Sequence, residues 1–225
     1  MRGVIAKQPG GPEELAFVEL DEPLLQKGEI LIDVQATAVN RTDILNREGK
    51  SGYAKNPVIG VEVAGIVADS NGCKGFAKGD RVMGGIVNGG AYADKVAMPA
   101  NRAMLIPESL TFEDAAAIPE VFLTAYQTLY WIGRLSKGET VLIHAGGSGV
   151  GTAAIQLAKT LSQAKVITTA GSHEKLQVCK RLGADLVINY KSEAFEEAVI
   201  KETRNTGVDL ILDFVGGKLL GEKLS

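Results

Sequence analysis

The sequence predicts a two-domain α/β protein, in which a small, mostly antiparallel barrel precedes a doubly wound parallel sheet. The first half consists of short Val-, Ile- and Ala-rich runs between Gly, Pro and Asp turns, whereas strands and helices alternate in the second half. The length of 225 residues suits two domains of roughly 100–150 residues. We therefore expect one domain over residues 1–120 and another over 121–225.

Five strands and one helix are expected in the first domain. The helix is Thr42–Glu48, and it interrupts a series of short apolar runs separated by turn residues. Short strands at this spacing are typical of a small antiparallel barrel. The expected strands are Arg2–Ala6, Glu29–Val39, Val61–Ala68, Arg81–Val87 and Tyr92–Ala97.

The pattern changes after Leu110. Thr111 is followed by two acids, as at a helix N-cap, and Pro119 is expected to start a second helix that runs to about Ile132. Beyond this helix, alternation of strands and helices predicts right-handed parallel units. The expected strands are Thr140–Ala145, Lys165–Ala170, Asp185–Tyr190 and Val208–Val215, and the helices are Val150–Gln163, Glu174–Leu182 and Glu193–Thr203.

The second domain has fewer strands than a complete dinucleotide-binding sheet. Such a sheet has about six strands, and only four are expected before Ser225. Residues Lys218–Ser225 resemble the start of a further helix. We therefore expect the chain to be a fragment, or a shortened form, of a longer two-domain protein.

Composition limits the classes of partner. The chain has 24 Lys and Arg against 27 Asp and Glu, a net charge of −3, which gives no electrostatic case for nucleic acid or an anionic membrane. No apolar stretch reaches the ~18 residues of a membrane span, and no signal peptide is evident. Two cysteines cannot form a disulfide framework. A cytoplasmic location is expected.

A glycine-rich turn carries the functional prediction. The apolar strand Thr140–Ala145 is followed by Gly146-Gly-Ser-Gly-Val-Gly151 and then by a helix of apolar period. In such a turn the helix begins with free N–H groups and the positive end of its dipole facing a pyrophosphate. Gly151 would let the helix approach the strand closely. The alternative is an ordinary tight turn, but the strand–turn–helix context favours a dinucleotide site.

The next strand indicates which dinucleotide binds. NAD sites place an acid about 20 residues beyond the first glycine, where it binds the ribose 2′-hydroxyl. No acid occurs between Thr152 and His173, and the segment offers Gly171, Ser172 and then Lys175 instead. Lys175 could meet a 2′-phosphate, with Tyr190 beside it, or could be an ordinary solvated lysine. We predict NADPH.

Together, these motifs resemble the zinc-free quinone oxidoreductases (ζ-crystallin-like) of the medium-chain dehydrogenase/reductase superfamily. The nearest resemblance is to the tumour-suppressor-inducible quinone oxidoreductase branch. The segments that carry it extend through the chain: Gly10–Glu13, Ala38–Asp43, Gly60–Glu62, Gly79–Val82, Ala115–Glu120, Leu123–Ala125, His144–Gln156 and Asn189–Tyr190.

The resemblance implies a GroES-like β-barrel domain, a Rossmann domain truncated at its C-terminus, and a cleft between them. It also implies residue roles. Gly146, Ser148, Gly149 and Val150 would contact the cofactor at the glycine turn. Gly171, Ser172, Lys175 and Tyr190 would hold the 2′-phosphate. Asn40, Thr124 and Val215 would line the nicotinamide pocket. A homodimer is implied for the full-length family form.

Some positions depart from relatives of this superfamily. Ser148 occupies a glycine position, as it does in the resembling branch. A pocket tyrosine is expected where Ser51 stands, and Tyr53 lies two residues further on. The zinc-ligand positions of metal-dependent relatives hold Asn40 and Val61, and no tetrahedral N/S site can be assembled from the remaining histidines and cysteines. We expect no metal.

The function predicted is hydride transfer from NADPH to a quinone. A quinone is electron-poor and becomes a delocalised anion, so orientation and hydrogen-bond donors can suffice. The best-placed polar groups are Asn40, Ser148 and Tyr53. Two alternatives remain open: an NADPH-dependent enoyl or alkenal reductase on the same fold, and a non-catalytic NADPH-binding form of the crystallin type.

Overall fold

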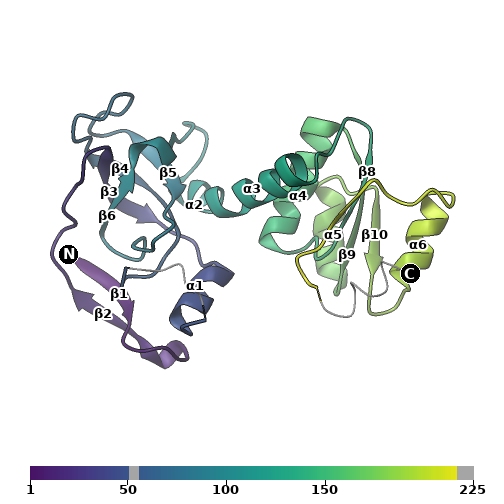
Figure 1. The fold of residues 1–225 in the computed structure, drawn as a ribbon, viewed down its shortest axis with the longest axis horizontal. Helices are drawn as coiled ribbons and strands as arrows, with labels where there is room; N and C mark the ends of the chain where they lie inside the picture. The colour runs from purple at the N-terminus through teal and green to yellow at the C-terminus, as the bar shows by residue number, and fades with distance from the viewer. Residues whose placement is uncertain (51–55, 217–225) are drawn as a thin grey trace. The chain divides into compact units, whose positions relative to one another are not determined.

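The computed structural model describes residues 1–50 and 56–216. By its internal contacts the chain divides into two compact units, Met1–Glu120 and Val121–Ser225 (Figure 1). Each unit has its own apolar core, and each is considered by itself below.

The first unit is built on a five-stranded antiparallel sheet of order β6-β3-β4-β5-β7. Its strands are β3 (Glu29–Ala36), β4 (Glu62–Asp69), β5 (Arg81–Gly85), β6 (Lys95–Pro99) and β7 (Ala103–Leu105). A separate hairpin pairs β1 (Arg2–Ala6) with β2 (Leu15–Glu19). The expected antiparallel N-terminal domain is confirmed, as a curled sheet. Its core contains Ile30, Ile32, Val63 and Val67, each without exposed surface.

Three helices belong to this unit or begin in it. Helix α1 (Arg41–Arg47) follows β3, and α2 (Phe112–Ala116) is capped by Thr111, whose side chain accepts the N–H of Asp114. Helix α3 (Pro119–Tyr126) starts at the predicted proline and continues as a π-helical turn, Gln127–Ile132. Short 3₁₀ turns occupy Pro12–Glu14 and Ala100–Arg102.

Three strands of this unit differ from the prediction: two were missed and one was misplaced. Strands β2 and β7 were missed, since both are short and exist through pairing with strands distant in the sequence. The strand expected at Tyr92–Ala97 lies instead at Lys95–Pro99. The reason is that the backbone N–H of Tyr92 bonds to Ile59, outside the ladder that Lys95 joins with Asp33.

The second unit has a parallel sheet of order β10-β9-β8-β11. The strands are β8 (Thr140–Ile143), β9 (Lys165–Ala170), β10 (Leu186–Asn189) and β11 (Leu210–Leu212). In chain order this is 3-2-1-4, the first four positions of a Rossmann sheet. The predicted doubly wound architecture is thus confirmed. The helix expected within Lys218–Ser225 lies outside the described residues.

Helices cover both faces of this sheet. Helices α4 (Gly149–Ser162) and α5 (His173–Arg181) lie on one side, and α6 (Phe195–Glu202) lies on the other (Figure 1). Alternation along β8 explains the two layers, because Val141 and Ile143 join the core with α4, whereas Leu142 packs in the cluster with Phe195. This layering brings the start of α4 to the carboxyl end of β8, where ligands of such sheets bind.

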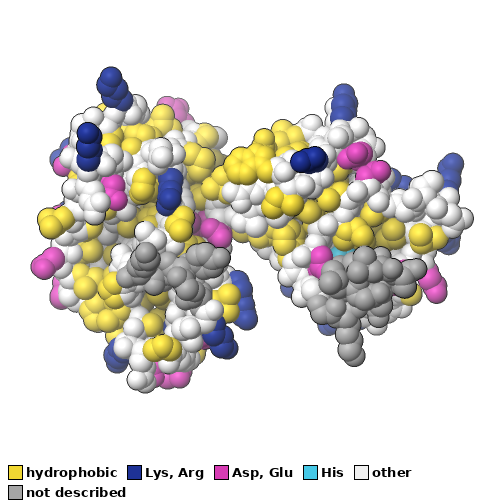
Figure 2. All heavy atoms as spheres, in the orientation of Figure 1, with side chains coloured by type: hydrophobic (Ala, Val, Ile, Leu, Met, Phe, Trp, Pro, Cys, Tyr) yellow, Lys and Arg dark blue, Asp and Glu magenta, His cyan; other side chains and the backbone are white. Residues whose placement is uncertain are grey.

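The surface shows no concentration of basic charge on the face in view. Lys and Arg side chains are scattered there among apolar and acidic ones (Figure 2). Of the helices that the structure describes, none is both long enough and apolar enough to cross a membrane.

Candidate functional site

The predicted phosphate-binding turn is a sharp strand-to-helix turn in the second unit. It follows β8, and its bend is at Ala145, whose φ of 54° is unusual for a residue with a side chain. Two backbone hydrogen bonds hold the turn: Ser148 N–H donates to the Ala145 carbonyl, and Gly146 N–H donates to that of Thr169, each at 2.9 Å. The turn is therefore fixed to both β8 and β9.

Three glycines of the motif have no room for a side chain. A Cβ at Gly146 would collide with Thr168 Oγ1, and one at Gly147 would lie 2.7 Å from Lys175 Cβ. A Cβ at Gly151 would collide with the Ala145 carbonyl oxygen and lie 2.7 Å from Gly146 Cα. The predicted reason for Gly151, close approach of the helix to the strand, agrees with this geometry.

Ser148 caps the helix that leaves the turn. Its Oγ accepts the N–H of Gly151 at 3.1 Å, and α4 then runs for 14 residues. A capped helix of this length carries a positive partial charge at its first turn, where backbone N–H groups point out of the helix. Gly149 at this end is exposed and Val150 is half-buried. The turn thus fits the pyrophosphate of a dinucleotide.

The residues predicted to hold a 2′-phosphate come together at the end of β9. Gly171 follows this strand, Ser172 caps α5, and Lys175 lies in the first turn of α5. The aliphatic part of the Lys175 side chain passes over Gly147, so this lysine lies directly against the glycine turn. Tyr190 Oη is 2.5 Å from the place a Gly171 Cβ would take.

Lys191 joins this group and was not singled out by the sequence analysis. Its Cε lies 3.1 Å from the same Cβ position at Gly171, beside the tyrosine hydroxyl. The only sequence signal was its position next to Tyr190, at the end of the third strand of the sheet. Two lysines and a tyrosine therefore surround the end of β9, an arrangement suited to an anionic group.

Two predicted residues of the nicotinamide pocket belong to other elements of this unit. Val215 follows β11 and is 57% exposed, and the pairing of β8 with β11 is extended by a bond from His144 N–H to the Leu212 carbonyl. Val215 thus follows the strand next to β8, at the carboxyl edge of the sheet. Thr124 is half-buried on α3.

In the first unit, Asn40 is held by two acids. It is the N-cap of α1 and forms a capping box with Asp43, whose Oδ2 accepts the Asn40 backbone N–H at 2.8 Å. Its side-chain Nδ2 donates to Glu62 Oε1 at 2.6 Å. The Asn40 side chain itself is half-buried. The amide is therefore firmly oriented.

Glu62 has no predicted role, yet it is the most enclosed acid near Asn40. It is 1% exposed, and its second oxygen, Oε2, accepts the backbone N–H of Glu120 at the start of α3 at 2.9 Å. Burial raises the pKa of Glu62, while the bonds from Asn40 and Glu120 act in the opposite direction. An acid inside the apolar strand run Val61–Ala68 was the available signal.

Asp43 is the second buried acid of this group, with 2% of its surface exposed. Besides Asn40, it accepts the N–H of Gly60 at 3.2 Å, and the Tyr92 hydroxyl lies 3.0 Å from its Oδ2. Burial raises the pKa of Asp43 despite these donors. Burial and the nearby Asp43 charge also raise the pKa of Tyr92, so the phenol stays protonated.

The raised pKa of Asp43 predicts a pH dependence of stability. The unfolded chain releases the Asp43 proton near pH 4, whereas the folded chain holds it to higher pH, so rising pH favours unfolding. The stabilising effect of this group is complete below about pH 4 and is lost as pH rises through the folded pKa. We therefore expect the difference in unfolding free energy between wild type and Asp43→Asn to shift steadily against wild type over this range.

Urea unfolding at a series of pH values measures this difference, because the asparagine variant lacks the titrating group and groups that do not interact with Asp43 cancel in the comparison. The Asp43 charge also contributes to the raised pKa of Glu62 and Glu120, and the loss of that contribution in the variant acts in the same direction. A difference that is independent of pH, or one that shifts in favour of wild type as pH rises, would contradict the assignment.

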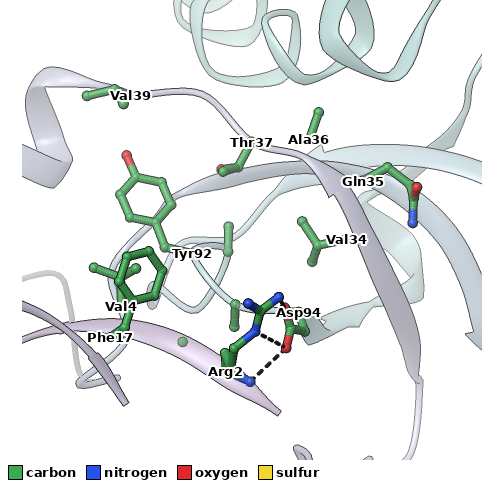
Figure 3. Close-up of a pocket in the computed structure, with 13 residues that line it drawn as sticks. Arg2, Val4, Phe17, Val34, Gln35, Ala36, Thr37, Val39, Tyr92 and Asp94 are labelled. Atoms are coloured by element: carbon green, nitrogen blue, oxygen red, sulfur yellow. Dashed lines mark hydrogen bonds and ion pairs between the residues drawn. The ribbon is translucent and has the colours of Figure 1, made fainter. Parts of the chain in front are cut away.

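A cavity in the first unit lies beside this cluster. It has a volume of ≈ 500 Å³, and apolar residues that include Val4, Phe17 and Val39 line most of it. Tyr92 stands in its wall, and the paired Arg2 and Asp94 are among its polar residues, with Gln35 and Thr37 (Figure 3). Of the predicted site residues that the structure describes, none lines this cavity.

Two further sequence predictions concern metal and the remaining site residue. Tyr53 lies outside the described residues. Among residues 1–50 and 56–216, no three His, Cys, Asp or Glu side chains are grouped so that they could hold a metal ion. His144 is an interior residue: it is 1% exposed, lies 2.9 Å from Thr169 Oγ1 through Nδ1, and contacts the ring of Phe195.

Comparison with known proteins agrees with the two units. A family model described as zinc-binding dehydrogenase matches residues 149–225, and one described as alcohol dehydrogenase GroES-like domain matches residues 26–108. The described residues do not offer the ligand group that the first name implies.

Solved structures match both units in one alignment. Quinone oxidoreductase of Escherichia coli, complexed with NADPH, is 33% identical with a TM-score of 0.90, covering 100% of this chain and 69% of its own. The CurK enoyl reductase is 26% identical with a TM-score of 0.90, covering 99% of this chain and 70% of its own.

Among curated proteins, a highly reducing polyketide synthase of Emericella nidulans is 37% identical over 201 residues. That match covers 86% of this chain but 8% of the synthase. Across the curated relatives compared, the chain spans between 8% and 54% of their length.

Proposed function

Because the chain belongs to the medium-chain dehydrogenase/reductase family and has quinone oxidoreductases among its relatives, we propose that it reduces a quinone with NADPH. One observation supports this most directly. The glycine turn capped by Ser148 lies directly against Lys175, so an anion-binding helix end and a cation occupy one edge of the sheet. This is the arrangement that a phosphorylated dinucleotide requires.

In this proposal the second unit binds and orients the cofactor. Backbone N–H groups at the start of α4 hold the pyrophosphate, and Lys175, Lys191, Ser172 and Tyr190 hold the 2′-phosphate. Thr124, Val215 and Asn40 remain the sequence-predicted residues for contact with the nicotinamide. When bound, NADPH supplies a hydride to the acceptor. Water delivers the proton that completes reduction to the hydroquinone.

The chain's own contribution to the chemistry is orientation and charge stabilisation. Hydride addition places negative charge on a quinone oxygen, and a fixed hydrogen-bond donor near that oxygen lowers the barrier. Asn40 and Ser148 are the proposed donors among the described residues, with Tyr53 as the remaining sequence-predicted candidate. Ser148 Oγ already accepts the Gly151 N–H, which leaves its hydroxyl proton free to donate.

A second candidate is reduction of an activated alkene, which uses the same fold and cofactor. The likeness to CurK enoyl reductase supports it. An enoyl reductase needs an acid that protonates the carbon next to the carbonyl, and Tyr53 is the sequence-predicted candidate. A Tyr53→Phe variant that loses only alkene reduction would favour this reading over the quinone reading.

Steady-state oxidation of NADPH tests the proposal. The chain is mixed with NADPH and either a small benzoquinone or a short enal, and loss of absorbance is followed with NADH as the parallel cofactor. We expect turnover with the quinone and a preference for NADPH over NADH. Firm NADPH binding without turnover of either acceptor would overturn the enzymatic proposal and favour a non-catalytic cofactor-binding role.

A further inference from the structure

The two ends of the Asn40 side-chain amide face groups of opposite kind, an accepting carboxylate at the nitrogen and a donating backbone N–H at the oxygen. Asn40 Nδ2 donates one hydrogen to Glu62 Oε1 at 2.6 Å, and the capping box turns its oxygen to the first turn of α1. The amide has two N–H hydrogens and one of them is used by Glu62. Within the described part of the chain, the structure gives the second N–H no partner.

In its ionised form Glu62 can only accept hydrogen bonds, so it pairs with the N–H end of the Asn40 amide and not with its oxygen. Its Oε2 accepts the backbone N–H of Glu120, which is a donor in every state of the chain, and its Oε1 faces Asn40. A carboxylate accepts at both oxygens, whereas the corresponding amide would accept at one end only. At 1% exposure, no bulk water can replace either bond.

We propose that Glu62 is a positioning residue that sets Asn40 as a hydrogen-bond donor, so that its second N–H is directed to the acceptor oxygen on which negative charge develops. This inference rests on the proposed function and adds to it that Asn40 acts as a hydrogen-bond donor rather than an acceptor. A donor stabilises a developing oxyanion, and an acceptor in its place would repel it. Asn40 is half-buried, so part of the residue is open to solvent.

The single variant Glu62→Gln tests whether Glu62 orients the Asn40 amide. The new amide can accept from Asn40 or from Glu120 but not from both, so one buried donor loses its partner or the Asn40 amide turns over. We expect a lower urea midpoint and a fall in kcat of at least tenfold with a quinone. The dissociation constant of NADPH stays as in wild type, because the cofactor's phosphates bind in the second unit.

The double variant Glu62→Gln with Asn40→Asp separates positioning from a purely structural role. It exchanges donor and acceptor within the pair: the new glutamine donates to the new aspartate and still accepts the Glu120 N–H. The two side chains again match donor with acceptor, and the net formal charge of the pair is the same as in wild type. However, the group offered to the ligand is now an acceptor. We expect the urea midpoint to recover towards wild type while kcat stays about 100-fold low.

Thr203→Val is the control for a loss of stability alone. Thr203 is 9% exposed, and its Oγ1 donates to the Val199 carbonyl at 2.8 Å and accepts the Gly207 N–H at 3.1 Å, at the end of α6. The change removes the partner of that N–H and leaves the side-chain bond between Asn40 and Glu62 intact. We expect this control to lose stability and to keep its kcat. A double variant that regains kcat together with stability would overturn the inference, because the pair would then be structural only.

Failure of the inference can be told from failure of the proposed function. If wild type turns over and the double variant does so equally well, the donor role of Asn40 is wrong and the function stands. If wild type binds NADPH but reduces neither acceptor, the proposed function fails and the donor role with it. NMR of the ¹⁵N-labelled protein tests the bond between Glu62 and Asn40 independently of activity. We expect the Asn40 side-chain signals to shift in Glu62→Gln, and unchanged signals would refute the positioning role.

Discussion

Gly151→Ala is expected to lower the free energy of unfolding by about 1–2 kcal/mol and to weaken NADPH binding at least tenfold. The added methyl group would collide with the Ala145 carbonyl oxygen and lie 2.7 Å from Gly146 Cα, and because both of these atoms are backbone, neither can move aside cheaply. Alanine gains up to about 1 kcal/mol over glycine in a helix, but overpacking costs roughly 1–3 kcal/mol. The helix must therefore shift from the strand, taking with it the N–H groups that bind the pyrophosphate.

Gly85→Ala is the control for this prediction. A methyl group at Gly85 in β5 meets only the Val61 carbonyl oxygen at 3.9 Å, an ordinary contact, and φ there is not positive. We expect this variant to bind NADPH as wild type does. Urea unfolding and a fluorescence titration with NADPH measure both effects. Wild-type stability and affinity in Gly151→Ala would show that close approach of α4 to β8 is not required.

Lys175→Ala is expected to reduce affinity for NADPH by roughly 10–150-fold and to leave affinity for NADH nearly unchanged. A charge-assisted contact with a phosphate contributes about 1.5–3 kcal/mol, and every 1.4 kcal/mol changes a dissociation constant tenfold. The two cofactors differ only in the 2′-phosphate, so their comparison isolates that contact. Calorimetric titration of both reduced cofactors is the measurement.

Lys180→Ala serves as the matched control, because Lys180 is an exposed lysine in the last turn of the same helix, far along α5 from the glycine turn. It should change neither affinity. Equal losses for NADPH and NADH in Lys175→Ala would place the lysine at the pyrophosphate instead. A loss of NADPH selectivity in Lys191→Ala alone would transfer the 2′-phosphate role to the neighbouring lysine.

Local signals were sufficient for several elements of both units. The strand predicted at Lys165–Ala170 has those bounds in the structure, and the predicted caps at Thr111 and Pro119 begin α2 and α3. These elements are specified by residues that are close in the sequence: an apolar run, a side-chain cap, a proline at the first helical position. Strand β2 lacked such a signal, because its stability comes from its pairing with β1.

The residues of the candidate site also fall into those predicted from the local sequence and those seen only in the structure. The glycine turn and Lys175 were predicted from spacing, since the constraints on a phosphate-binding turn act between neighbours along the chain. Glu62 and Lys191 were not, because what matters about each is its partner in space. Glu62 bonds to Asn40, 22 residues earlier, and to Glu120, 58 residues later. No periodicity links such positions.

The amino-acid sequence by itself determined the order of the elements, the two kinds of sheet and the turn that fits a pyrophosphate, because steric and capping preferences are local. Only the tertiary structure decided that Lys175 lies over Gly147, that Lys191 flanks Gly171, and that a buried carboxylate holds the amide of Asn40. Those contacts join segments separated by many residues, and chain folding brings such segments together through burial of apolar surface, which is not directional. The polar partners within the core are then specified by geometry rather than by spacing.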